Sequence, residues 1–176
     1  MNDTMIDAMN DTMIDAMNDP SGFPPVASLL PHSGRMVLLE RVLSADHDKL
    51  CAEVRIDADS MLCGADGVGA WVGIEYMAQA IAAHAGWHAL KRGEPVKVGF
   101  LLGSRKYEAA RACFAPGSTL HVHVQRVLQG ENGLGAFECR IDAAGAPATL
   151  ATLATATVTV FQPKNVNEFL KDGSAV

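Results

Sequence analysis

Hydrophobic and polar residues alternate over long stretches in the second half of this 176-residue chain. Thr119–Leu128 alternates strongly, with Leu or Val at 120, 122 and 124, and Leu134–Ile141 alternates again after the turn sequence Gly130–Gly133. A period of two is typical of a strand with one buried face, and two such runs joined by a short Gly-containing turn predict a β-hairpin. The β-branched run Thr149–Phe161 predicts a final long strand.

The first half of the chain carries shorter apolar runs. Val26–Leu30 is long enough for one helical turn, which Pro31 is expected to stop. Met36–Val42 is rich in Val and Leu and predicts a strand, and Leu50–Ile56 alternates as a returning strand after a turn at 46–48. Two paired strands are therefore expected in this part of the chain.

One long helical pattern separates the early strands from the later ones. It covers about residues 70–90, after a loop at 57–68 with little pattern, and basic residues followed by Gly at 91–93 form a typical C-terminal stop. A strand with a bend at Gly103 follows over 96–110. One helix cannot cover both faces of a parallel sheet, so this order predicts an α+β domain in which a curved antiparallel sheet wraps around one central helix.

A repeat sets the first 20 residues apart. The octet Met-Asn-Asp-Thr-Met-Ile-Asp-Ala is written twice, a partial third copy follows, and the segment contains five Asp and no Lys or Arg. Asn, Asp and Thr are poor helix-interior residues. We therefore expect 1–20 to be an appendage outside the fold, 21–163 to form the domain and 164–176 to be a C-terminal tail.

The repeat also accounts for most of the net charge of −6. Without it the chain has 15 acidic and 14 basic residues and no long basic run, which argues against a nucleic-acid binder. An acidic N-terminus does not suit a signal peptide, and no stretch of about 18 apolar residues is available to span a membrane. Four widely spaced Cys without a Cys-x-x-Cys pair favour reduced thiols in a cytoplasmic protein over two disulfides.

The predicted helix carries one acidic residue, Glu75, and an amide one turn later, Gln79. At 100° per residue, both lie on a face that is otherwise lined mostly by small residues. Burying an ionised carboxylate is costly unless it is paired, and a partly buried carboxyl group suits a general acid near neutral pH. Glu75 is therefore the first candidate for acid–base chemistry, and an exposed or salt-bridged acid is the alternative.

Five of the six histidines form three groups. His84 and His88 are four residues apart, as in a metal-binding helix, but no third ligand lies near them in the sequence, so we expect a solvated or capping pair. His121 and His123 alternate along one strand, which is typical of a solvated strand face. His32 differs because it lies directly before the first predicted strand. No nucleophile elbow and no phosphate-binding Gly-rich loop accompany these residues.

Taken together, these segments resemble the β-hydroxyacyl-acyl-carrier-protein dehydratases, over roughly residues 23–162. The likeness is closest to the small dehydratase-like proteins encoded with aryl-polyene-type lipid and pigment synthesis genes. It implies the hotdog fold, usually as a dimer. The helix sequence, in which an acid precedes Met-Ala-Gln, is the most specific part. The matching segments are Leu30-Pro31-His32, Met36–Val42, Trp71–Ala80, Gly99–Leu102 and Arg105–Tyr107.

The resemblance also implies roles for residues of the predicted helix. Glu75 would be the acid–base carboxylate, and Gln79 would support it one turn later. Backbone N–H groups at the helix start, around Ala70 to Gly73 and including that of Trp71, would bind the thioester oxygen as negative charge develops on it. Gly73 would leave room for substrate beside the backbone.

One departure from that family affects the chemistry. Its housekeeping members carry a catalytic His in the loop before the central helix, whereas residues 57–69 contain none, and His32 is the only well-placed replacement. The implied activity is removal of water from a 3-hydroxyacyl thioester of acyl carrier protein or coenzyme A, without cofactor or metal. A homodimer, a larger homo-oligomer or a hetero-oligomer is expected. The alternatives are a hotdog thioesterase, in which Glu75 activates water, and a non-catalytic acyl-binding subunit of a heteromeric dehydratase.

Overall fold

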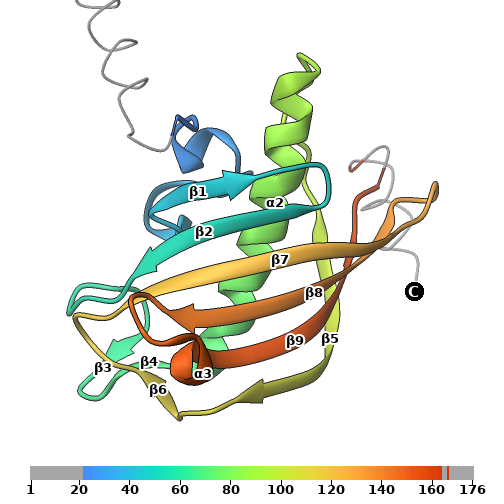
Figure 1. Cartoon of the computed structure of the whole chain (residues 1–176). Coiled ribbons are helices and arrows are strands. Elements are labelled where there is room, and N and C mark those ends of the chain that lie inside the picture. The colour runs from blue at the N-terminus through green and yellow to red at the C-terminus, as the bar shows by residue number, and fades with distance from the viewer. Residues whose placement is uncertain (1–21, 164–165, 167–176) are drawn as a thin grey trace, which may run out of the picture.

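The computed structural model describes residues 22–163 and residue 166. The predicted appendage at 1–20, and the predicted tail apart from residue 166, lie outside the described residues. Within the described part, a six-stranded antiparallel sheet curves around one long helix (Figure 1). The predicted α+β architecture is therefore confirmed. No helix in this part of the chain is long and apolar enough to cross a membrane.

The strands of the large sheet lie in the order β1-β2-β7-β8-β9-β5. They are β1 (Arg41–Ala45), β2 (Lys49–Arg55), β7 (Thr119–Gln129), β8 (Leu134–Ala143), β9 (Thr152–Phe161) and β5 (Phe100–Ala109). A second sheet contains β3 (Cys63–Gly64), β4 (Gly67–Gly69) and β6 (Cys113–Phe114). The helices are the 3-10 turns η1 (Val26–Ser28), η2 (Gly34–Met36) and η3 (Ala70–Val72), the long helix α2 (Gly73–Lys91) and the short helix α3 (Ala148–Ala151).

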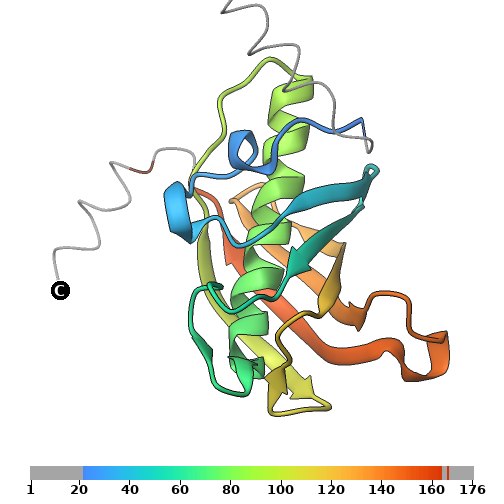
Figure 2. The ribbon, with the colours of Figure 1, turned by 90° about the vertical axis from the view of Figure 1, so that its left-hand side faces the viewer.

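The alternation in the sequence separates the two faces of the large sheet. On β7 the inner residues Leu120, Val122 and Val124 are buried against α2, whereas the outer residues His121 and His123 are half-buried. Figure 2 shows α2 on one side of the sheet, with the segment from 22 to 38 (blue) beside the helix. The side of α2 turned away from the sheet is thus covered in part by this segment.

The predicted strand at Met36–Val42 starts too early. Met36 belongs to η2, and pairing with β2 begins at Glu40, whose N–H donates to a β2 carbonyl at 2.8 Å. The backbone at residues 36 and 38 instead bonds to the side chain of Gln79 on α2. This stretch is therefore held by the helix and not by a neighbouring strand.

Other boundaries differ because short elements carry no periodic signal. The strands of the small sheet contain two or three residues each, and the sequence did not predict them. The final strand begins at Thr152 and not at Thr149, because α3 forms directly after Pro147. The strand after the long helix begins at Phe100, and its pairing with β9 shifts between Leu101 and Gly103, where a bend is predicted.

The histidine pair of α2 is not solvated as expected. His84 is 2% exposed, and its Nε2 atom lies 3.0 Å from the Asp46 carbonyl. The His88 Nε2 atom lies 3.1 Å from the His47 carbonyl and 3.2 Å from His84 Nε2. The pair therefore fastens the turn between β1 and β2 to α2.

We expect the contact between His84 and the turn that joins β1 and β2 to weaken at acidic pH. Burial is the main cause that lowers the pKa of His84, and the neighbouring His88 and Arg126 add to it. The unfolded chain, with an ordinary pKa near 6.5, then binds the proton more readily than the folded chain. The free energy of unfolding should be highest above about pH 6.5 and should fall as the pH drops toward the folded-state pKa. Denaturant titrations from about pH 7 to about pH 5 check this.

The variant His84→Gln should show a smaller fall over that range, because glutamine does not titrate. The exposed Gln125→Glu variant serves as a control for a change of charge on β7. An unchanged pH dependence in His84→Gln would contradict the assignment to His84.

Candidate active site

A cavity of about 170 Å³ lies between α2 and the ends of β5 and β9. Its wall on the helix consists largely of Ala78, Ala82 and Ala85, of which the first two belong to the small-residue face predicted around Glu75. Phe100 and Phe161, which pair across β5 and β9, line it from the sheet. The sequence did not identify these aromatic residues, because their pairing depends on the strand order. The cavity is apolar along most of its wall.

Two of the titratable side chains that line this cavity lie next to each other. The Nε2 atom of His32 lies 3.6 Å from the Oε1 atom of Glu75. Both side chains are about one third exposed, 29% for His32 and 35% for Glu75, so the pair faces an accessible space. The Nδ1 atom of His32 is buried without a hydrogen-bond partner among the described residues, which leaves Nε2 as the nitrogen that faces Glu75. The structure thus brings together the two residues predicted to be catalytic.

Gln79 holds Glu75 in place. It is fully buried, and its Nε2 atom donates to Glu75 Oε1 at 2.9 Å and to the Met36 carbonyl at 2.8 Å. Its Oε1 atom accepts the N–H of Leu38 at 2.9 Å. All polar groups of the amide are therefore used within the protein. None of these groups is left for a substrate, and the geometry is that of a residue that positions Glu75, the supporting role that the resemblance implies for it.

We expect Gln79→Glu to lower kcat at pH 7 by about 10- to 100-fold. The new side chain keeps the shape but cannot donate to Glu75 unless it carries a proton, and two carboxylates in one site repel each other. The rate should therefore depend on pH differently from that of the wild type, which a pH–rate profile measures. Gln125→Glu on the outer face of the sheet is the matched control, and identical profiles for both variants would contradict the positioning role.

The start of the helix differs from the prediction in two places. The N–H of Ala70 donates to the Ala112 carbonyl at 2.8 Å, so it is not available to a thioester oxygen. The space beside Gly73 is filled by protein: an added Cβ would lie 2.5 Å from the Tyr107 hydroxyl and 2.9 Å from Ile141. Gly73 therefore allows close packing and does not admit substrate.

Trp71 is the remaining residue predicted at the helix start. Its side chain is 65% exposed, and it lies one helical turn before Glu75. The first N–H groups of a helix have no intrahelical acceptor, so the amide of Trp71 stays a candidate donor for a developing negative charge.

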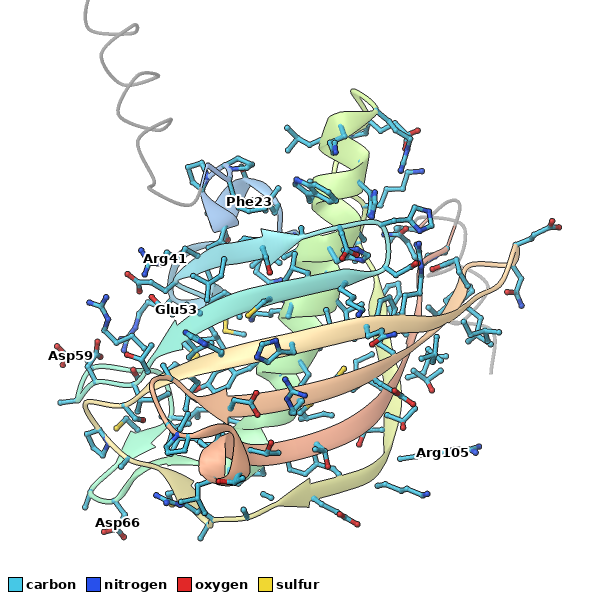
Figure 3. All side chains as sticks on the ribbon, in the orientation of Figure 1. Phe23, Arg41, Glu53, Asp59, Asp66 and Arg105 are labelled. Carbon is cyan, nitrogen blue, oxygen red and sulfur yellow. The ribbon has the colours of Figure 1, made fainter. Side chains whose placement is uncertain are left out.

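A larger hollow of about 680 Å³ lies on the outer face of the sheet, away from Glu75 and His32. Ion pairs occupy this face. Arg41 and Glu53, labelled in Figure 3, lie 3.1 Å apart, and His123 lies 3.3 Å from Asp142. We place the candidate site in the smaller cavity, because that cavity holds an acid–base pair beside an apolar wall. Among residues 22–163 and 166, no three His, Cys, Asp or Glu side chains are grouped to hold a metal ion.

The chain is similar to a family of dehydratases and to several solved structures. Residues 24–171 match the family model described as ApeP-like, ApeP dehydratase. Among solved structures, the chain resembles the dehydratase heterocomplex ApeI:P from Xenorhabdus doucetiae, with 34% identity over 85% of this chain and 97% of that chain, and a TM-score of 0.76. No curated protein sequence matches the chain.

Two more distant structures share the fold. One is the PaaI protein of the phenylacetic acid degradation operon of E. coli, with 18% identity over 69% of this chain and 81% of that chain, and a TM-score of 0.52. The other is a hypothetical thioesterase with coenzyme A from Streptococcus pneumoniae, with 14% identity over 69% of this chain and 84% of that chain, and a TM-score of 0.51. These likenesses confirm the predicted hotdog fold.

Proposed function

Because the chain belongs to the ApeP-like family of dehydratases, we propose that it removes water from a 3-hydroxyacyl thioester and forms the 2-enoyl thioester. The observation that carries this proposal is the pair of His32 and Glu75, 3.6 Å apart at an apolar cavity. A base and an acid at one end of an apolar pocket are what this elimination needs.

The reaction breaks one C–H bond and one C–O bond. A base takes the α-proton, the electron pair of that bond forms the C=C bond, and the hydroxyl group leaves with a proton from an acid. His32 and Glu75 carry these two proton transfers. Negative charge develops on the thioester oxygen during the reaction, and the N–H of Trp71 at the helix start lies in the region where a dipole would stabilise it.

The acyl chain occupies the apolar part of the cavity. From Glu75 to Ala85 the helix extends about 15 Å, and small side chains along that length leave room beside it. Phe100 and Phe161 face this space from the sheet. An apolar slot of this kind suits the acyl group of fatty-acid-like or polyene synthesis, carried on acyl carrier protein or coenzyme A.

A second hotdog chain pairs with strand β5. This strand of ten residues lies at the end of the sheet order, and its Leu101 and Leu102 are 41% and 57% exposed. A long apolar edge strand is a template for pairing with another chain. The similar ApeI:P protein is described as a heterocomplex, which supports assembly with either a second copy or a different subunit.

The test is to supply a 3-hydroxyacyl thioester, on coenzyme A and on acyl carrier protein, and to follow enoyl absorbance together with free thiol. Enoyl product without early thiol supports the proposal. Thiol release without enoyl product supports the thioesterase alternative. Binding of the thioester with neither product, both for the chain alone and with a partner subunit, supports the non-catalytic alternative and overturns the proposal.

A further inference from the structure

The segment that carries His32 is packed against α2 of its own chain on its N-terminal side. The backbone of Leu29 lies directly on Gly86 of the helix, where even a Cβ atom would overlap with the Leu29 carbonyl. Leu29 and Leu30 are buried, and the ring of Phe23 lies 6.2 Å from that of Trp87 on the same helix. This contact fixes the chain three residues before His32.

A second contact with the same helix follows His32. The side chain of Gln79 bonds to the Met36 carbonyl at 2.8 Å and to the Leu38 N–H at 2.9 Å. Both bonds lie within one chain and are inaccessible to solvent at Gln79, which is fully buried. The loop that carries His32 is thus held on both sides by one helix (Figure 2).

These two contacts limit where His32 can lie. His32 is the third residue after Leu29, so its backbone stays within about 10 Å of that fixed point. Its Nε2 atom lies 3.6 Å from Glu75 Oε1, and Gln79 fixes that same oxygen at 2.9 Å. No contact from another chain is needed to bring the two groups together.

We propose that the catalytic pair is intramolecular, so that each copy of this chain supplies both His32 and Glu75 to the same site. The inference rests on the proposed function. A site built across an interface would instead combine His32 of one chain with Glu75 of the partner subunit. The number of sites then equals the number of copies of this chain, whatever the second subunit is.

Hybrid dimers distinguish the two arrangements. Two copies with different affinity tags are co-expressed, and the hybrid is purified over both tags. Hybrid A combines a His32→Gln chain with a Glu75→Gln chain, and hybrid B combines a wild-type chain with a chain that carries both substitutions. If the pair is intramolecular, hybrid A is as inactive as each single variant, and hybrid B keeps about half of the wild-type rate.

The opposite pattern overturns the inference. A site shared between subunits gives hybrid A one intact site, about half of the wild-type rate, and leaves hybrid B inactive. A doubly tagged wild-type hybrid, assayed alone and with a partner subunit, is the activity control, and a lack of turnover in both assays contradicts the proposed function instead. In a complex with one copy of this chain, inactivity of both single variants supports the inference, and full activity of either one contradicts it. His121→Gln on the outer face is the matched folding control.

Discussion

Replacement of Glu75 by Gln is expected to lower kcat for dehydration by about 10²- to 10⁴-fold, the range that one positioned acid–base group contributes. The amide has nearly the same shape and can still occupy the site 2.9 Å from Gln79. It can neither accept the proton nor carry a negative charge beside His32, so the step that needs this group is lost. The rate of enoyl formation at saturating thioester measures the effect.

The matched control for this variant is Glu138→Gln, at an exposed position of β8 on the outer face. It removes the same charge far from the cavity and should leave kcat unchanged. Glu75→Gln should also unfold at nearly the same temperature as the wild type, because Glu75 is 35% exposed and is not part of the core. A wild-type rate in Glu75→Gln would show that the carboxylate takes no part in the reaction.

The long elements of the fold were predictable because they repeat one pattern many times. Leu120, Val122 and Val124 report a strand with one buried face, and the structure buries those three residues. The stretch from Met36 to Val42 contains the same residue types, but strand β1 begins only at Arg41. Its backbone bonds to Gln79, a contact across 41 to 43 residues that no local pattern contains.

The contrast between local patterns and long-range contacts also explains why Glu75 was predicted better than the surroundings of the helix start. Glu75 stood out because it is the only acidic residue of an Ala-rich helix, and a local sequence is enough to show that. The helix start was predicted less well, because its surroundings come from β5. There the pairing shifts between Arg105 and Glu108, Lys106 has a φ of 53°, and Tyr107 donates to the Ala70 carbonyl. Only the folded chain shows that Tyr107 fills the space beside Gly73.

Replacement of Gly86 by Ala is expected to destabilise the protein, although helix propensity alone predicts the opposite. In a helix interior Ala is favoured over Gly by about 1 kcal/mol. At Gly86, however, the added Cβ atom would overlap with the carbonyl oxygen of Leu29 and lie 2.8 Å from its carbonyl carbon. Those are backbone atoms, so no side-chain rotation relieves the contact and the segment must move. Overpacking costs about 1–3 kcal/mol, and an overlap with backbone atoms lies at the upper end of that range, so the cost outweighs the gain in helix propensity.

The loss should reach the chemistry as well, because the displaced segment carries His32 three residues later. Gly86→Ala should therefore lower both the free energy of unfolding, by about 1–2 kcal/mol net, and kcat. Denaturant titration and the enoyl assay measure the two effects on the same preparation. Gly64→Ala is the matched control, since the nearest atom to an added Cβ atom there lies 3.8 Å away, an ordinary contact. A more stable Gly86→Ala protein, as helix propensity alone predicts, would contradict the close contact with Leu29 on which the position of His32 depends.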